Sequence, residues 1–192
     1  MEKKIKNNFL KKKYLYYSLL RTKNSYGFSL KETHSKNFPY ILGIRYKNCI
    51  ININSIIQPL KRSLKLLNDF KGKKILIIYN TINYNFLKKY LKFSKNVSVL
   101  HYTKLNGFLT NYKNNLTKKK LKKPDLILNL GFTKDTSFLK EAYFFKIPVI
   151  HLTNIKKNNI YKNYSIIYNS KQIQSNFFII YLFRKILKKI QK

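Results

Sequence analysis

The sequence contains very few acidic residues. Only 6 of its 192 residues are Asp or Glu, against 41 Lys and Arg, which gives a formal net charge of +35 at pH 7. Self-repulsion of this size destabilises a compact chain, so the sequence predicts a polyanionic partner. Nucleic acid and an anionic membrane are the two candidates.

Cysteine, glycine and long apolar runs are also scarce. The single cysteine, Cys49, excludes an internal disulfide framework and lies in an apolar run, where we expect a small buried hydrophobe. No cluster of metal ligands is present, so we expect no metal. The longest apolar run, Phe177 to Phe183, has seven residues, far short of the roughly 20 that cross a bilayer. Neither common glycine-rich phosphate loop occurs, so we also expect no cofactor.

Catalytic groups are equally hard to find. Asp125 begins a predicted strand and Asp135 follows its end, and helix capping explains Asp135 better than catalysis does. His34, His101 and His151 are far apart in sequence and form no recognisable nucleophile–base pair. The sequence therefore argues against an enzyme.

The abundant residues share AT-rich codons. Lys, Asn, Ile, Tyr and Phe supply 114 residues, whereas Arg occurs four times and Trp is absent. An AT-biased genome, typical of organelles, produces such a composition and accounts for part of the lysine excess. It does not account for the scarcity of Glu, which also has an AT-rich codon. Residues 1–23, basic and nearly free of acid, are similar to a mitochondrial presequence.

Apolar periodicity predicts an α/β fold. Residues 124–152 indicate a strand, a helix and a second strand, which should pair in parallel with a right-handed crossover. The apolar residues of that helix are Phe138, Leu139, Ala142 and Phe145. Strands are expected near residues 75–79, 97–100, 126–130, 149–152 and 164–168. Helices are expected near residues 11–20, 56–70, 81–93 and from 171 to the C-terminus.

These elements predict a three-layer sandwich with a five-stranded, mostly parallel sheet, flavodoxin-like or Rossmann-like. A hairpin over residues 41–53 is expected to turn at Lys47-Asn48, and Asn54 or Ser55 is expected to cap the next helix. Residues 1–37 are expected to form a basic N-terminal extension and residues 38–192 the α/β domain. Tyrosines interleaved with lysines in the extension suit unpaired bases and phosphates, although a solvated or disordered tail remains an alternative.

Several short motifs occur in a characteristic order. They are HSKNFPYILGIR (34–45), IINI (50–53), KKILII (73–78), LNGFLTNY (105–112), PDLIL (124–128), KEA (140–142) and IPVI (147–150). In order and, apart from one gap, in spacing, they resemble the S-two family, the second small-subunit ribosomal protein of bacteria and organelles. The resemblance covers about residues 34–190.

The chain departs from the family pattern in three places. Lys104 and Asn106 replace a tryptophan and a glycine of the family motif, and residues 151–154 lack its aspartate. The long helical hairpin of bacterial members is missing, because only residues 113–123 fill its interval. Its contacts are therefore absent or taken over by the lysine cluster there.

The resemblance implies a non-enzymatic, structural protein of the small subunit of an organellar ribosome, with the mitochondrion preferred over the plastid. The α/β domain would then dock on small-subunit rRNA and neighbouring ribosomal proteins, with no membrane and no small-molecule substrate as partner. RNA shape rather than base identity would supply discrimination. The predicted phosphate contacts are Lys11, Lys12, Lys13, Arg21, Lys23, Lys36, Arg45, Lys104, Lys118, Lys119, Lys120, Lys122, Lys123, Lys188 and Lys189.

Two other classes remain open at this point. A Rossmann-like nucleotide-binding enzyme would show saturable nucleotide binding at the strand ends. A peripheral protein on anionic membranes would use the basic C-terminal helix and float with vesicles.

Overall fold

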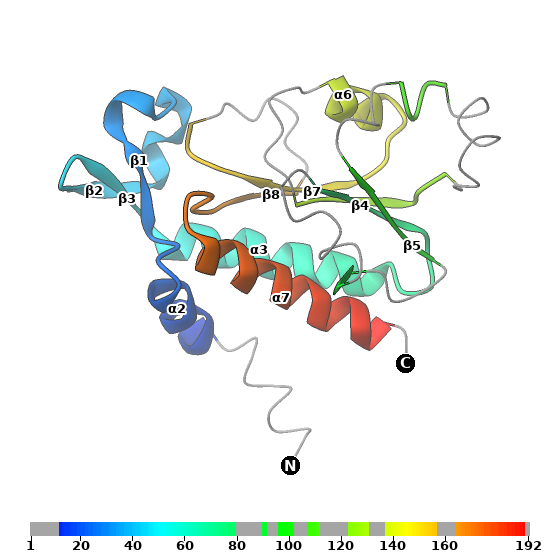
Figure 1. Ribbon diagram of the computed structural model, residues 1–192, viewed down its shortest axis with the longest axis horizontal. Coiled ribbons are helices and arrows are strands. Elements are labelled where there is room, and N and C mark those ends of the chain that lie inside the picture. The colour runs from blue at the N-terminus through cyan, green and yellow to red at the C-terminus, as the bar shows by residue number, and fades with distance from the viewer. Residues whose placement is uncertain are drawn as a thin grey trace, which may run out of the picture.

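The computed structural model describes residues 12–79, 90–91, 96–101, 107–111, 123–130, 137–156 and 164–190. Its centre is a five-stranded sheet with the order β5-β4-β6-β7-β8, and every pairing in it is parallel (Figure 1). The strands are β4 (Ile75–Tyr79), β5 (Val97–His101), β6 (Leu126–Asn129), β7 (Val149–Thr153) and β8 (Tyr164–Ile167). The predicted α/β class and five-stranded sheet are confirmed.

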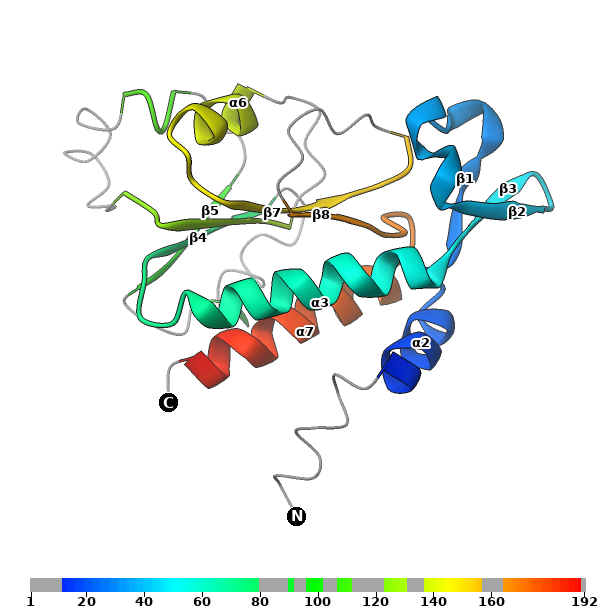
Figure 2. The ribbon, with the colours of Figure 1, turned by 180° about the vertical axis from the view of Figure 1, so that it is seen from behind.

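Helices cover both faces of this sheet. Helices α3 (Ile53–Asp69) and α7 (Ile173–Ile190) lie side by side on one face, and α6 (Ser137–Phe144) lies on the other (Figures 1 and 2). Strand β4 shows why both faces must be covered, since all five of its side chains are buried. Such a continuous apolar strand is typical of the middle of a parallel sheet.

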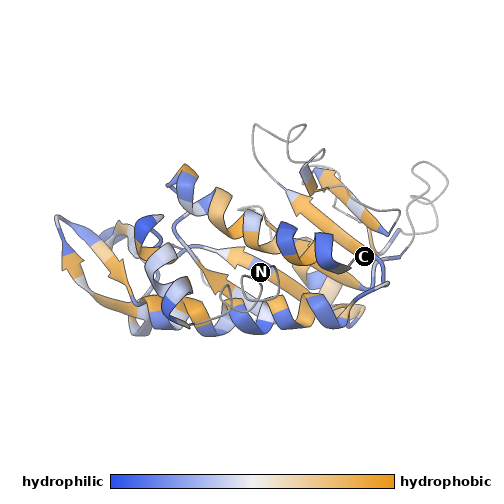
Figure 3. Ribbon diagram, turned by 90° about the horizontal axis from the view of Figure 1, so that it is seen from below, coloured by the Kyte–Doolittle hydropathy of each residue, from blue (hydrophilic) through white to orange (hydrophobic). Residues whose placement is uncertain are grey.

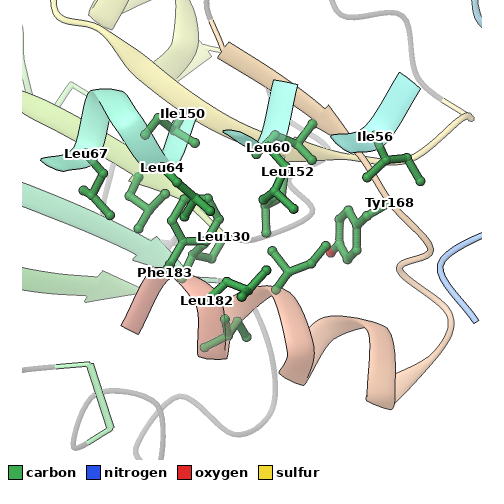
Figure 4. Packing of buried hydrophobic residues seen from close by; sticks show 14 of the residues in the cluster. Ile56, Leu60, Leu64, Leu67, Leu130, Ile150, Leu152, Tyr168, Leu182 and Phe183 are labelled. Carbon is green, nitrogen blue, oxygen red and sulfur yellow. The ribbon is translucent and has the colours of Figure 1, made fainter. Parts of the chain in front are cut away.

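The larger core lies between the sheet and the pair α3 and α7. Leu60 and Leu64 of α3 point toward Leu152 of β7 and Phe183 of α7, and all four are buried (Figure 4). Burying such a side chain contributes about 1.5–3 kcal/mol. Helix α3 is amphipathic, with its apolar residues toward the core and hydrophilic residues outward (Figure 3). Helix α7 also buries an apolar face, but its exposed residues include Ile173, Phe177 and Tyr181.

Two details of α3 and α6 differ from the sequence prediction. Helix α3 begins at Ile53, because the Asn52 side chain accepts a hydrogen bond from the Asn54 N–H at 3.0 Å and caps the helix two or three residues early. Phe145, predicted as one of the apolar residues of the helix, is 40% exposed. Helix α6 ends at Phe144, and the turn that follows directs the Phe145 ring outward.

A second, antiparallel sheet has the order β1-β3-β2. It contains β1 (Tyr26–Ser29), β2 (Ile41–Arg45) and β3 (Asn48–Ile51), with 3₁₀ helices at Leu30–Glu32 and Ser35–Tyr40. The expected hairpin forms, but it turns at Tyr46 and Lys47, one residue earlier than predicted. Both have positive φ, 46° and 63°, as a two-residue type I′ turn requires. Strand β1 was not predicted.

Residues 12–37, the described part of the expected extension, pack on the rest of the chain. Helix α2 (Lys12–Arg21) buries Leu15 and Leu19 and contacts α3. Buried Asn24 accepts a short hydrogen bond from the Ser175 hydroxyl of α7. These contacts link the N-terminal segment to the C-terminal helix.

Some predicted elements fall outside the described residues. They include most of the helix expected at 81–93 and Asp135, the proposed helix cap. Among the described residues, no helix has the length and apolar character needed to cross a membrane.

Candidate nucleic-acid interface

Three of the few carboxylates stabilise the fold. Glu141 of α6 accepts backbone N–H bonds from Gly107 and Leu109 at 2.9 Å each and from Thr110 at 3.3 Å. Asp125 accepts the N–H of Lys74 at 2.8 Å and so joins the segments that enter β6 and β4. Glu141 and Asp125 thus act as acceptors for backbone donors and are not arranged as a catalytic acid and base.

Glu32 has a similar structural role. The Lys156 ammonium donates a hydrogen bond to Glu32, and this bond lowers the pKa of the Glu32 carboxyl below its ordinary value. The same ammonium lies 4.3 Å from the centroid of the Phe28 ring, a cation–π contact. Lys156 is therefore engaged within the fold.

The described N-terminal cations lie on the surface. Lys13 and Arg21 of α2 and Lys23 after it are exposed, as are Lys36 and Arg45 near the small sheet. Helix α2 and the small sheet occupy the same end of the molecule (Figures 1 and 2). The structure thus brings these five predicted residues to one end.

A second group lies at the opposite end. In a parallel sheet all strands begin at one edge, and exposed lysines precede three of the strands. We call this group the basic edge; it consists of Lys71, Lys73 and Lys74 before β4, Lys123 before β6, and Lys146 before β7. Helix α7 returns to the same end of the molecule (Figure 1), where Lys188 and Lys189 are exposed.

Four residues of the basic edge were not in the predicted set. Only Lys123 was predicted; Lys71, Lys73, Lys74 and Lys146 are scattered in sequence and are gathered by the strand order. The usable signal was their position just before apolar strands. No single lysine run marks them.

The remaining predicted cations are not placed by the structure. Lys11, Lys104, Lys118, Lys119, Lys120 and Lys122 lie outside the described residues, and of Lys12 only the helical backbone is described. Their phosphate contacts remain predictions. The replacement of the hairpin contacts by the lysine cluster also stays a prediction, because only Lys123 of residues 113–123 is described.

Some exposed cations already contact aromatic rings. Arg45 lies 5.4 Å from the Tyr46 ring centroid, and Lys123 lies 5.2 Å from that of Phe145. Arg184 is only 3.6 Å from the ring centroid of Tyr90, a packed contact within the fold. The first two pairs are at the surface, where an aromatic face and a cation together suit a nucleotide.

At the carboxyl end of the sheet, where α/β proteins usually bind ligands, the described residues that follow β7 and β8 make structural contacts. Asn154 after β7 is buried and donates to the Ser170 hydroxyl at 3.2 Å. Tyr168 after β8 is buried, and this burial raises the pKa of its phenol above the ordinary value. Cys49 is fully buried, as predicted. Within the described residues, no three metal-ligating side chains come together.

The fold and this surface define a class, a strongly basic α/β protein whose described acids are largely used internally and whose cations face outward at both ends. Such a charge pattern is the electrostatic footprint of nucleic-acid binding.

A protein-family comparison specifies the class further. The family model described as Ribosomal protein S2 matches residues 19–123, more than half of the chain. The chain therefore belongs to the ribosomal protein S2 family. This family comprises non-enzymatic structural components of the small ribosomal subunit. A search of curated proteins found no match.

Proposed function

We propose that this chain is a structural protein of the small subunit of an organellar ribosome, in the mitochondrion, where it binds small-subunit rRNA and neighbouring ribosomal proteins. The observation that carries the proposal is membership of the S2 family together with a net charge of +35. The AT-rich codon usage implied by 114 Lys, Asn, Ile, Tyr and Phe residues supports an organellar genome.

The proposed work is electrostatic positioning. Exposed lysines at both ends of the molecule contact phosphates and release condensed counterions, while the sheet and its helices hold those lysines at fixed separations. Two groups at opposite ends allow the protein to bridge separate stretches of rRNA backbone. Lysine–phosphate contacts carry no base information, so recognition of the correct site depends on RNA shape.

Gradient sedimentation tests the proposal. The tagged full chain is expressed in its own cells, mitochondria and plastids are separated, and each lysate is sedimented with mass spectrometry of the peak fractions. We expect the chain to co-migrate with the mitochondrial small subunit at about 50 mM salt. Co-migration with plastid or cytosolic subunits would contradict the location, and migration away from all small subunits would contradict the ribosomal role.

A further inference from the structure

A cavity of about 550 Å³ opens at the amino-terminal edge of the parallel sheet. It lies where α6 ends and where β7 and β8 begin, which places it beside Lys146 of the basic edge. The residues that line it are Tyr143, Phe144, Lys146, Ile147, Pro148 and Tyr164. It is separate from the carboxyl end of the sheet, where ligands of α/β proteins usually bind.

The aromatic side chains at this cavity are unusually exposed. Phe144 is 80% exposed and Tyr143 is 60% exposed, although both belong to a helix whose other aromatic, Phe138, is 2% exposed and part of the core. The Tyr143 and Phe144 rings form an edge-to-face pair with centroids 6.5 Å apart. Neighbouring exposed aromatics of this kind mark a binding surface more often than a lone exposed ring does.

The backbone holds these rings in place. The Ile147 N–H donates to the Ala142 carbonyl and the Lys146 N–H to the Tyr143 carbonyl, each at 3.0 Å. Lys146 has a φ of 53°, which completes the Schellman pattern of helix termination. The rings therefore sit on a fixed helix end.

The charge around the cavity is positive. Lys146 lines it, the Lys123 ammonium lies 5.2 Å from the neighbouring Phe145 ring, and exposed Lys140 lies one turn before Phe144 on the same side of α6. The nearby carboxylate of Glu141 is occupied by three backbone N–H groups. A ligand with an aromatic face and an attached anion is complementary to this arrangement.

We propose that this pocket takes an unpaired nucleobase of the rRNA, which stacks on the Phe144 ring beside Tyr143 while its flanking phosphates pair with Lys146 and Lys123. The inference rests on the proposed function and adds a recognition site to it. An apolar side chain of a neighbouring protein would fill the aromatic surface but would leave the surrounding lysines without anions. An unpaired nucleotide supplies both groups, and base–aromatic stacking is a general mode of single-strand recognition.

A stacking assay on the full chain tests the pocket. The probe is a ten-nucleotide single-stranded RNA with one central 2-aminopurine, whose emission falls when it stacks. Stacking contributes about 1–3 kcal/mol per base, so Phe144→Ala should weaken binding by about tenfold and relieve the quenching. The control is Phe177→Ala, which removes a 46% exposed ring on α7 at the opposite face of the sheet; it should change neither signal.

Two further readings separate stacking from charge. Phe144→Ala should leave the slope of log affinity against log salt unchanged, whereas Lys146→Gln should reduce its magnitude by about 0.7, the value for one phosphate contact on a single strand. Duplex RNA of equal length should bind wild type and Phe144→Ala equally, because its bases are already stacked. Equal affinity and quenching for Phe144→Ala and Phe177→Ala would overturn the pocket.

Cross-linking from position 144 in assembled particles distinguishes the possible occupants. With Phe144→p-benzoylphenylalanine, cross-links to rRNA support the pocket, and cross-links to protein alone overturn it in favour of a protein neighbour. Failure of the wild-type chain to enter small subunits would instead contradict the proposed function. The two failures are therefore distinguishable.

Discussion

Lys146 occupies a backbone conformation that costs an L-residue energy. Its φ of 53° is left-handed, where the Cβ of a non-glycine residue is crowded at a cost of about 1 kcal/mol. Glycine is the usual residue at this position of a helix end. A lysine there gives the cavity a cation at the expense of stability.

Replacing Lys146 by glycine should therefore increase stability and weaken RNA binding. Lys146→Gly should raise the free energy of unfolding by up to about 1 kcal/mol while weakening RNA binding, as measured by urea denaturation and by the stacking assay. The matched control is Lys140→Gly, the same chemical change within α6, which should lower stability by about 1 kcal/mol. Destabilisation of equal size by both changes would show that Lys146 is not strained.

Glu141 provides the second prediction at the level of the residue. Its carboxylate accepts the N–H groups of Gly107, Leu109 and Thr110, and a glutamine retains only one acceptor oxygen. Glu141→Gln should cost about 1.5–3 kcal/mol of stability, the range for hydrogen bonds to charged groups. It should also speed hydrogen exchange at these three amides.

Asp69→Asn is the control for Glu141→Gln, because it raises the net charge by the same amount at an exposed position. It should change stability by less than about 0.5 kcal/mol. If both variants lose the same stability, then overall charge and not the three hydrogen bonds is responsible.

At the level of the element, predictability followed the strength of the local pattern. Strand β4 is five consecutive apolar residues, all buried, and its position was predicted without error. Strand β1, with the sequence YGFS, is short, contains a glycine and lacks alternation, so nothing in the pattern identified it. The hairpin turn shifted by one residue because Tyr46 adopts a positive φ, which is uncommon for an aromatic residue.

The candidate interface was less predictable than the fold. Runs such as Lys11–Lys13 are visible in the sequence, whereas the basic edge joins Lys74, Lys123 and Lys146 only because β4, β6 and β7 are parallel neighbours. Periodicity predicts that a strand exists but does not give the order of strands in the sheet. The aromatic cavity also depends on where α6 ends. Phe145 was predicted to belong to this helix, whereas the helix ends at Phe144.

Helix α2 provides the prediction at this level. Leu19 is fully buried whereas its neighbour Leu20 is 41% exposed. Leu19→Ala should lower stability by about 2–5 kcal/mol, the range for deleting a buried leucine, and should speed hydrogen exchange throughout residues 12–21. Leu20→Ala should leave both nearly unchanged. Similar exchange in the two variants would mean that α2 is not anchored through Leu19.

The whole molecule is governed by its charge. A net charge of +35 repels itself in the free protein and attracts phosphate in the bound one, and both effects are screened over about 10 Å at 0.1 M ionic strength. Added salt therefore acts with opposite sign on folding and on binding. A protein of balanced charge would show neither trend to this extent.

The opposite effects of salt on folding and on RNA binding can be measured on one preparation of the protein. Between 50 and 200 mM potassium chloride, the free chain should unfold at a higher temperature, because salt screens the repulsion among its lysines. Over the same interval, affinity for structured rRNA should fall by about 10³-fold or more if six or more phosphates are contacted. Sucrose at matched osmolality should not weaken RNA binding in this way, because it releases no counterions. A melting temperature that falls with salt would show that self-repulsion does not limit the stability of the free chain. An affinity that does not change with salt would show that the lysines do not contact phosphates.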